Sequence, residues 1–291
     1  MLTPSRTVPW DTPPKPFVKW AGGKGQLIDK LKPFFPEKFG TYFEPFLGGG
    51  AVFFSLLVSA RQFDAFLSDT NKELITTYSV IKDEPERLIS TLARHKECYE
   101  RAPEDYFYAV RESEPTFNVE IAARLIFLNK TCFNGLYRVN SKGKFNVPFG
   151  RYRNPAICDK ENLKAVSNAL RWSKAKIACL DYSEAAKQAK KDDFLYFDPP
   201  YHPVSKTANF TAYTQSGFSP KDQENLAKLC KELSDRGCKV LVSNSNTEDV
   251  LSLYDDKERF VVQTVPAMRA INCKGNLRSG HSELIIRTKY A

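Results

Sequence analysis

The sequence predicts an α/β protein built around a mostly parallel sheet, and three observations lead to this prediction. Short apolar segments typical of strands alternate with helical segments along most of the chain. Glycine or proline turns follow several of the strand segments. The last strand segment follows a helix-free stretch, Asn272 to Gly280, which favours an antiparallel strand at one edge of the sheet. The 291 residues, 42% of them hydrophobic, suffice for one large domain or two modest ones.

The strand and helix segments follow one another in a regular order. The first strand, Tyr42–Phe46, runs into Gly48-Gly49-Gly50, and a buried helix continues from Ala51 to Ala60. A second strand, Phe63–Ser68, ends at Asp69. The remaining strand segments are apolar runs bounded by turn residues, with a helix at Pro220–Arg236 between two of them: Lys176–Leu180, Phe194–Phe197, Lys239–Ser243, Arg259–Val265 and Ser282–Thr288.

The alternation stops between residues 72 and 163. Helical patterns dominate there, at Glu73–Ile81, Pro85–Lys96 and Val119–Lys130, and a basic, glycine-containing loop follows from Asn134 to Arg153. We therefore predict an insertion, 72–163, between the second and third strands. The main domain comprises residues 17–71 and 164–291, and residues 1–16, with five prolines, form a flexible tail.

Positive charge is concentrated in one stretch of the chain. The protein has 43 Lys and Arg against 34 Asp and Glu, a net charge of +9. Eleven of the basic residues lie between Lys130 and Lys176, where only Asp159 and Glu161 oppose them. Charge alone is consistent with a solvated face or with a surface that binds a polyanion.

The sequence provides few parts for a metal site, a disulfide framework or a membrane anchor. Its seven cysteines include no CxxC pair, and only three histidines are present. We predict no metal. No apolar run approaches the roughly 20 residues of a membrane span, and the proline-rich start does not resemble a signal peptide, so we expect a cytoplasmic protein.

Two glycine-rich turns are candidate ligand sites. Gly48 precedes Asp69 by 21 residues, close to the spacing at which an acidic residue meets a ribose hydroxyl in nucleotide-binding folds. A simple tight turn is the other interpretation. Gly22-Gly23-Lys24-Gly25 is not a phosphate loop, because the earlier glycine and the Ser or Thr after the lysine are both missing.

The sharpest signal is Asp198-Pro199-Pro200-Tyr201, directly after the apolar strand Phe194–Phe197. A carboxylate at the carboxyl end of a parallel strand faces the crevice in which open α/β sheets bind ligands. The two prolines stiffen the turn and present carbonyl groups without N–H groups. Tyr201 adds a ring suited to stacking on a planar base. A proline turn that only caps the strand is the less economical interpretation.

Four motifs in order resemble the Dam-type family of DNA adenine-N6 methyltransferases, in the alpha group that recognises GATC. They are Phe17–Lys24, Phe43–Gly50, Asn134–Arg138 with Phe145–Tyr152, and Asp198–Tyr201. The resemblance runs from about Phe17 to the end of the chain. It implies a Rossmann-like, S-adenosylmethionine-dependent methyltransferase sheet, with 72–163 as a mainly helical target-recognition insertion. It also implies double-stranded DNA as partner, base flipping, and S-adenosylhomocysteine as the product of the cofactor.

The resemblance also assigns expected roles to individual residues. The catalytic residues would be Asp198, Pro199, Pro200 and Tyr201. The cofactor-binding residues would be Trp20, Lys24, Phe43, Glu44, Pro45, Phe46, Gly48, Gly50, Asp69, Asp181, Tyr182 and Asp198. The DNA-binding residues would be Lys19, Phe133, Asn134, Leu136, Arg138, Pro148 and Tyr152. Thr131-Cys132-Phe133 departs from the more aromatic run of some relatives, which leaves open which ring intercalates.

Two alternatives to a DNA adenine methyltransferase were weighed. An RNA methyltransferase acting on a base amine can carry a similar catalytic turn, but those we can compare lack a long insertion before it. A DNA-binding protein that has lost catalysis should show an altered Asp198 or a broken glycine turn, and neither is present. No obligate protein partner is evident, and a companion restriction endonuclease would be a separate chain. The expected location is the bacterial nucleoid or the cytoplasm of a virus host.

Overall fold

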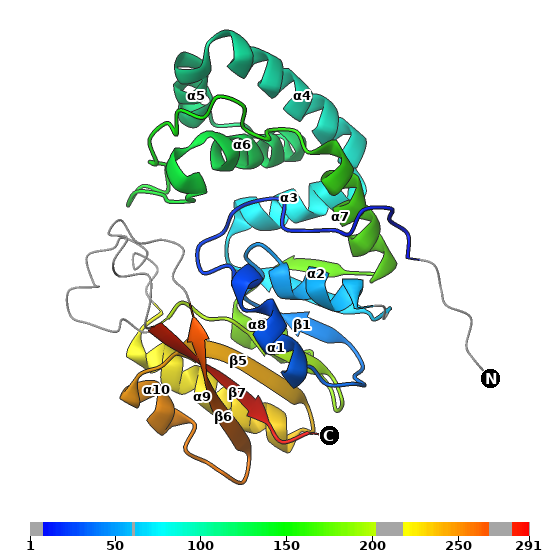
Figure 1. The fold of residues 1–291 in the computed structure, drawn as a ribbon, viewed down its shortest axis with the longest axis vertical. Helices are drawn as coiled ribbons and strands as arrows, with labels where there is room; N and C mark the ends of the chain where they lie inside the picture. Colours follow the sequence, from blue (N-terminus) through cyan, green and yellow to red (C-terminus); the bar gives the residue numbers. More distant parts are fainter. Residues whose placement is uncertain (1–7, 60–61, 202–217, 268–280, 291) are drawn as a thin grey trace. The chain divides into compact units, whose positions relative to one another are not determined.

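We describe the fold from a computed structural model. It describes residues 8–59, 62–201, 218–267 and 281–290 (Figure 1). The predicted helix end at Ala60, the stretch from Asn272 to Gly280 and residues 1–7 of the predicted tail lie outside these ranges.

The described strands form one sheet in the order β3-β2-β1-β4-β5-β7-β6. Their bounds are β1 Tyr42–Glu44, β2 Ala65–Asp69, β3 Lys176–Cys179, β4 Phe194–Phe197, β5 Lys239–Ser245, β6 Phe260–Ala267 and β7 His281–Thr288. The β1 strand pairs parallel with β2 and β4, and β4 pairs parallel with β5. The β7 strand pairs antiparallel with both β5 and β6. The α/β class and the antiparallel strand are confirmed, and β7 lies one position inside the edge because β6 is outermost.

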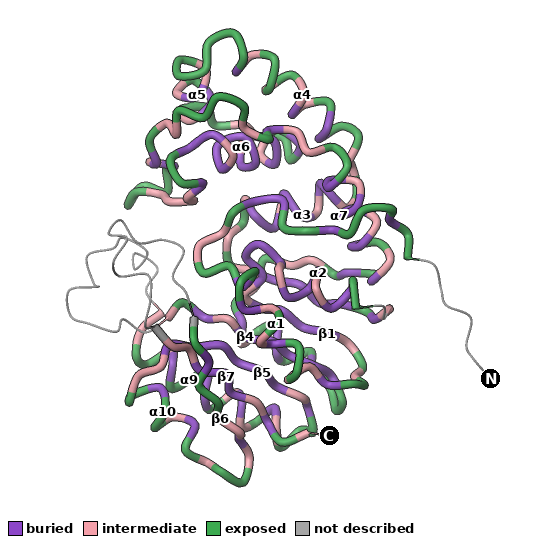
Figure 2. Tube along the Cα trace, in the orientation of Figure 1, coloured by how far each residue is buried: buried purple, intermediate pink, exposed green. Residues whose placement is uncertain are grey.

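The central strands are buried, as their continuous apolar sequences predict for a sheet covered on both faces. Every residue of β4 is buried, and so are Val240, Leu241 and Val242 of β5 (Figure 2). The pairing places Phe43 of β1 opposite Phe66 and Leu195 of its two neighbours. Because these side chains are buried, the carboxyl end of β4, directly before Asp198, has a fixed position in the sheet.

The helices and 3₁₀ turns connect these strands. Their bounds are η1 Lys24–Gln26, α1 Ile28–Leu31, η2 Lys32–Phe34, α2 Ala51–Val58, α3 Lys72–Asp83, α4 Pro85–Arg101, α5 Pro103–Glu112, α6 Asn118–Thr131, η3 Phe133–Gly135, α7 Lys160–Trp172, α8 Tyr182–Ala186, α9 Pro220–Asp235 and α10 Glu248–Leu253. The predicted helices correspond to α2, α3, α4, α6 and α9. Residue Asn71 caps α3 and Ser219 caps α9 through side-chain oxygens. No described helix is long and apolar enough to cross a membrane.

The chain divides into two compact units, which we describe separately. The first comprises residues 1–23, 48–63 and 69–179, and the second comprises residues 24–47, 64–68 and 180–291. In the first unit, α6 packs against α3, α4 and α5, and α3 also contacts α7 and β3. In the second unit, α9 packs on β5 and α10 packs on α9. Because the first unit also contains residues 48–63 and 164–179, it extends beyond residues 72–163, whose role as a recognition module stays a prediction.

The described part of the proline-rich segment, residues 8–16, is fastened to the first unit. Trp10 is buried with its ring edge-on to Trp172 of α7, at 5.3 Å between centroids. The Asn162 side chain exchanges two hydrogen bonds with the backbone of Lys15, each 3.0 Å long. A side-chain amide that satisfies one backbone N–H and one C=O fixes an extended segment in the same way as a neighbouring strand.

Candidate active site

The predicted catalytic carboxylate lies in the second unit and is paired with a lysine. Asp198 directly follows β4, and its Oδ1 lies 2.7 Å from Nζ of Lys24 at the start of η1. The two side chains are 18% and 5% exposed. Burial raises the pKa of Asp198 to about 6, with the Lys24 ammonium lowering it and the Glu283 charge raising it. At neutral pH the carboxylate is therefore mostly ionised and accepts hydrogen bonds.

The predicted stacking ring, Tyr201, is held at both its face and its hydroxyl. The Lys24 Nζ lies 4.6 Å from the centroid of the Tyr201 ring, a cation–π contact. The Tyr201 hydroxyl donates a hydrogen bond of 2.5 Å to Oε2 of Glu283 in β7. Lys24, Asp198, Tyr201 and Glu283 thus form one cluster in the second unit, which we call the catalytic cluster.

The proline turn between Asp198 and Tyr201 is held by a hydrogen bond from α9. The carbonyl of Pro200 accepts a hydrogen bond of 3.2 Å from Nε2 of Gln223 in α9. Gln223 in turn accepts a bond of 2.9 Å from Nδ2 of Asn244 in β5, and both amide side chains are buried. Because a buried amide must satisfy its polar atoms, this pair holds the turn at a defined place. Pro199 is also buried.

Three aromatic rings of the second unit lie together: those of the predicted cofactor residues Phe46 and Tyr182, and that of Phe218. The Phe46 and Tyr182 rings stack at 5.3 Å between centroids with an interplanar angle of 23°. Phe218 lies 5.7 Å from each of them. Asp181 caps α8 by accepting the N–H of Ser183 at 2.8 Å. The structure therefore brings Tyr182, which the resemblance places near the adenine of a cofactor, together with the predicted cofactor residue Phe46 and with Phe218, which was not predicted.

The other predicted cofactor residues of this unit are deep in the sheet. Phe43, Glu44 and Pro45 are buried, and Oε2 of Glu44 accepts a bond of 2.8 Å from the Tyr42 hydroxyl. Burial and the Glu44 charge raise the pKa of Tyr42, so its hydroxyl remains a donor. The Phe43 ring stacks on Phe66. These contacts give Phe43 a packing role in the core.

The predicted glycine turn lies in the first unit and is held by Asp69. The Gly48 N–H donates to Oδ2 of Asp69 at 3.0 Å, and the Asn71 N–H donates to Oδ1 at 2.9 Å. Gly48 and Gly50 have φ angles of +47° and +69°. A Cβ at Gly48 would lie 2.7 Å from Cδ1 of Trp20, so this position requires glycine twice over. Trp20, Gly48 and Asp69 thus lie together in this unit, and their role in cofactor binding stays a prediction, as does that of Gly50.

Trp20 is itself fixed by the neighbouring helices of the first unit. Its ring stacks on Tyr137 at 5.1 Å, and the Tyr137 hydroxyl donates to Oε2 of Glu73 at 2.9 Å. Burial followed by the Glu73 charge raises the pKa of Tyr137 well above its ordinary value. Backbone N–H groups of Gly48, Thr70 and Asn71 interact with the Asp69 carboxylate, which has about four lone-pair sites, so Asp69 has acceptor capacity left for a ligand.

Several predicted DNA-binding residues line one small pocket of the first unit. The pocket has a volume of about 170 Å³ and is lined by Lys19, Asn129, Lys130, Asn134, Gly135 and Tyr152. Asn129 Nδ2 donates to the carbonyls of Lys19, at 2.8 Å, and Gly135, at 2.9 Å. Its Oδ1 accepts the Lys19 N–H at 2.8 Å. Asn129, which sequence reasoning missed, therefore joins two predicted DNA-contact segments.

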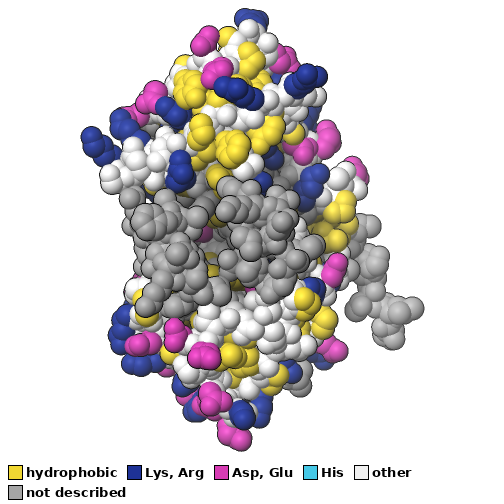
Figure 3. Space-filling view, turned by 60° about the vertical axis from the view of Figure 1, so that its left-hand side comes forward, with side chains coloured by type: hydrophobic (Ala, Val, Ile, Leu, Met, Phe, Trp, Pro, Cys, Tyr) yellow, Lys and Arg dark blue, Asp and Glu magenta, His cyan; other side chains and the backbone are white. Residues whose placement is uncertain are grey.

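The remaining predicted DNA-binding residues lie in the loop after α6. The Phe133 and Tyr152 side chains are 51% and 41% exposed, which is unusual for large rings, and Pro148 is exposed while Leu136 is half-buried. The Phe133 N–H donates to the Pro148 carbonyl at 2.8 Å. Arg138 donates through Nε to Oδ1 of Asn146 at 2.7 Å, so its guanidinium is already oriented within the loop. On the face in Figure 3, the described Lys and Arg side chains lie among Asp and Glu side chains.

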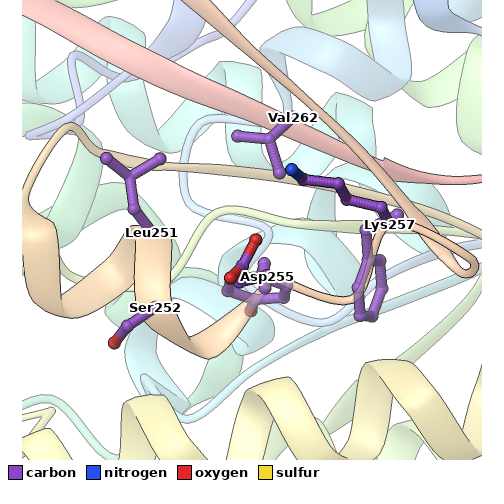
Figure 4. Close-up of a pocket in the computed structure, with 7 residues that line it drawn as sticks. Leu251, Ser252, Asp255, Lys257 and Val262 are labelled. Carbon is purple, nitrogen blue, oxygen red and sulfur yellow. The ribbon is translucent and has the colours of Figure 1, made fainter.

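A further pocket, of about 360 Å³, lies at α10 and β6 of the second unit (Figure 4). Leu251, Ser252, Asp255, Lys257 and Val262 line it, together with Tyr254 and Phe260. None of the predicted site residues belongs to it. Among the described residues, no group of three or more His, Cys, Asp and Glu side chains could hold a metal ion.

Comparisons with known proteins decide the family. The family model of the D12 class N6 adenine-specific DNA methyltransferases matches residues 20–271. This chain belongs to that family. The type II methyltransferase M.MjaIII of Methanocaldococcus jannaschii is 43% identical, over 94% of this chain and 98% of that protein. The type II methyltransferase M1.LlaDCHI of Lactococcus lactis is 41% identical, over 94% of each chain. The DNA adenine methylase of Serratia marcescens is 36% identical, over 92% of this chain and 96% of that protein.

In this D12-class DNA methyltransferase, Glu283 and Gln223 contact the catalytic turn, and the sequence analysis predicted neither of them. The family match includes the catalytic turn but ends before Glu283. Glu283 had no motif and no spacing to mark it, because only the strand order brings β7 near the end of β4. Gln223 lies in a helix whose sequence shows an ordinary amphipathic pattern. Neither residue carries a signal that sequence reasoning alone could use.

Proposed function

We propose that this D12-class protein transfers a methyl group from S-adenosylmethionine to N6 of an adenine that is flipped out of double-stranded DNA, within GATC. The observation that carries the proposal is the catalytic cluster, in which an ionised Asp198 and the Tyr201 ring adjoin the end of β4. The order of the four motifs and the GATC site are those of the alpha group that the sequence resembles. Names of relatives, adenine methylases among them, agree with the target base.

The residues present suit the cofactor on chemical grounds. We propose that Asp69, with its remaining acceptor capacity, binds a ribose hydroxyl of S-adenosylmethionine and that the Trp20 ring lies against its sulfonium-bearing part. Phe46 and Tyr182 provide stacking surface for its adenine, next to the Asp181 carboxylate. S-adenosylmethionine supplies an electrophilic methyl group on a sulfonium ion. The Lys24 side chain, Gly48, Gly50 and the backbone at Phe43, Glu44 and Pro45 complete the proposed set.

Asp198 would activate the target nitrogen by hydrogen bonding. The lone pair of adenine N6 is delocalised into the ring, so the amine is a poor nucleophile. Bonds from its two N–H groups to the Asp198 carboxylate and the Pro199 carbonyl would favour a tetrahedral nitrogen whose lone pair points at the methyl group. S-adenosylmethionine would supply the methyl group and leave as S-adenosylhomocysteine. The Asp198 carboxylate, which already accepts a hydrogen bond from the amine, would be placed to take the proton that N6 loses. Preorganised acceptors of this kind need neither a metal nor a covalent intermediate.

The adenine must leave the duplex to reach this geometry. Unstacking costs a few kcal/mol, and stacking on Tyr201 would offset part of that cost. We propose that the exposed rings of Phe133 and Tyr152 and the side chains of Lys19 and Asn134 contact the duplex. Arg138, Leu136 and Pro148 lie on the same loop. The RNA alternative has no support from the family match, which is to DNA methyltransferases.

Methylation of plasmid DNA tests the proposal. The protein is expressed in a host without adenine methylation, and the plasmid is digested with enzymes that cut GATC only when it is methylated or only when it is not. With the wild-type protein, we expect the plasmid to be fully protected from the enzyme that cuts only unmethylated GATC. With Asp198→Ala, expressed at the same level, we expect no protection. N6-methyladenine at other sequences only would refute GATC, and its complete absence would refute the activity. Type II relatives suggest pairing with a separately encoded endonuclease, which host restriction assays would reveal.

A further inference from the structure

Glu283 is the one charged member of the catalytic cluster without a role in the proposed reaction. It lies near the start of β7, opposite Ser245 of β5 and Val265 of β6. Its Oε2 accepts the hydrogen bond of 2.5 Å from the Tyr201 hydroxyl. The backbone of Glu283 is thus fixed on both sides by antiparallel pairing, and its side chain holds the far end of the Tyr201 ring.

The hydrogen bond to Glu283 restricts the Tyr201 ring, which comes directly after the proline turn. The Pro200 carbonyl of that turn accepts a hydrogen bond from Gln223. A phenol that donates to a carboxylate makes a charge-assisted bond, which is stronger than a neutral one. The pKa of Tyr201 is raised, first by burial and then by the Asp198 and Glu283 charges, so the hydroxyl keeps its proton and remains the donor. With the hydroxyl anchored, the plane of the ring is set before any base arrives.

We propose that Glu283 is a positioning residue for methyl transfer, which fixes the Tyr201 ring in the plane on which the flipped adenine stacks. This inference rests on the proposed role of Tyr201 in the reaction. Its energetic basis is preorganisation: a ring ordered in advance loses less conformational freedom when the base stacks on it. The effect of Glu283 therefore appears in the rate of transfer once DNA and cofactor are bound.

Glu283 also acts on Asp198 through its charge. The titratable or charged groups that interact with Asp198 are Lys24 on η1, Tyr42 on β1, Tyr196 on β4, Tyr201 in the catalytic turn and Glu283 on β7. Among them Lys24 lowers the pKa of Asp198, and Glu283 raises it. Removal of the negative charge at position 283 lowers the pKa of Asp198, so the carboxylate stays ionised to lower pH.

The test separates the hydroxyl contact from the charge. Glu283→Ala removes both, Glu283→Gln keeps an acceptor oxygen without the charge, and Tyr201→Phe removes the donor but keeps the ring. We expect Glu283→Ala to lower kcat by about tenfold or more, the usual range for losing a bond to a charged group. Glu283→Gln should restore kcat to within about threefold of wild type at neutral pH. The KM for S-adenosylmethionine should stay within about twofold in both variants, because the lost contact acts on the ring and not on the cofactor.

A double variant and a pH profile complete the test. Glu283→Ala in the Tyr201→Phe background should cost nothing further, because the contact is already absent. With Glu283→Gln, the acidic limb of the kcat profile should move to lower pH. Glu258→Ala, an exposed carboxylate of the same unit, is the control for a general loss of charge.

Each outcome decides the proposal. Equal kcat for Glu283→Ala and wild type overturns it, as does a loss that Glu283→Gln does not recover and that adds fully to Tyr201→Phe, since a purely structural role predicts both. Thermal unfolding identifies any variant that is misfolded. If Glu283→Ala is misfolded, the pH profile of Glu283→Gln decides the proposal. An active wild-type protein whose Glu283 variants keep its kcat refutes the role of Glu283 alone. A wild-type protein that does not methylate DNA refutes the proposed function and, with it, this role.

Discussion

Replacement of Lys24 by methionine isolates the effect of its charge on Asp198. The variant keeps most of the aliphatic stem and removes the ammonium that lies 2.7 Å from the carboxylate. An opposite charge at this range lowers a carboxyl pKa by about 1–3 units. The pKa of Asp198 is about 6 in the intact protein, and loss of the ammonium would raise it above the pH of the assay. At pH 7.5 the ionised form would then fall from nearly all of the protein to a minority, a loss of several-fold.

The direction in which the rate changes with pH depends on which form of Asp198 accepts the hydrogen bonds of the amine. The ionised carboxylate is the active form, so the rate falls as pH decreases through the pKa of Asp198. Lys24→Met should therefore lower kcat several-fold at pH 7.5 and recover as the pH rises further. The assay is transfer of labelled methyl groups to DNA at saturating cofactor, measured from pH 5.5 to 9.5.

A control and a refutation complete this prediction. Lys32→Met removes an exposed lysine of the same unit, paired with Asp29 at 2.8 Å on the surface, and should leave the profile unchanged. The reasoning is refuted when Lys24→Met keeps the acidic limb of wild type while the KM for S-adenosylmethionine rises. That result would assign Lys24 to cofactor binding alone.

Three further predictions follow from the same structure. Asp198→Ala should abolish methyl transfer and keep most nonspecific DNA binding, and turnover above roughly a tenth of wild type would remove Asp198 from the catalytic role. Affinity for any duplex should fall with salt with a log–log slope of about −0.9 for each phosphate that Lys130 to Lys176 neutralises, and a flat response would contradict the basic surface. Arg138→Ala should reduce methylation of GATC by about 1–3 kcal/mol relative to sites with another first base. A uniform loss at every site would instead make Arg138 a phosphate contact. Asn146→Ala removes the side-chain acceptor of Arg138 and keeps the backbone one, so it should narrow the preference for GATC less than Arg138→Ala does.

Local features of the sequence determined much of this protein. Alternating apolar strands and helical segments predicted the α/β class, because side-chain periodicity and turn residues act within a few positions of the chain. The same locality placed Asp198 at the end of β4, since a buried apolar run followed by two prolines marks where a strand stops. The spacing marked Gly48 and Asp69 as parts of a candidate ligand site, and the structure adds the direct hydrogen bond between them and the positive φ of Gly48.

Only the tertiary structure decided which distant residues join these motifs. The sequence placed its last strand at the edge of the sheet, whereas β7 lies between β5 and β6, which brings Glu283 to Tyr201. Lys24 was expected to bind a cofactor, and the structure also pairs it with Asp198. Asn129 looked like one more residue of an apolar helix, yet it joins Lys19 to the η3 turn. Strand order and buried hydrogen bonds arise from packing between segments far apart in the chain, so no local pattern encodes them.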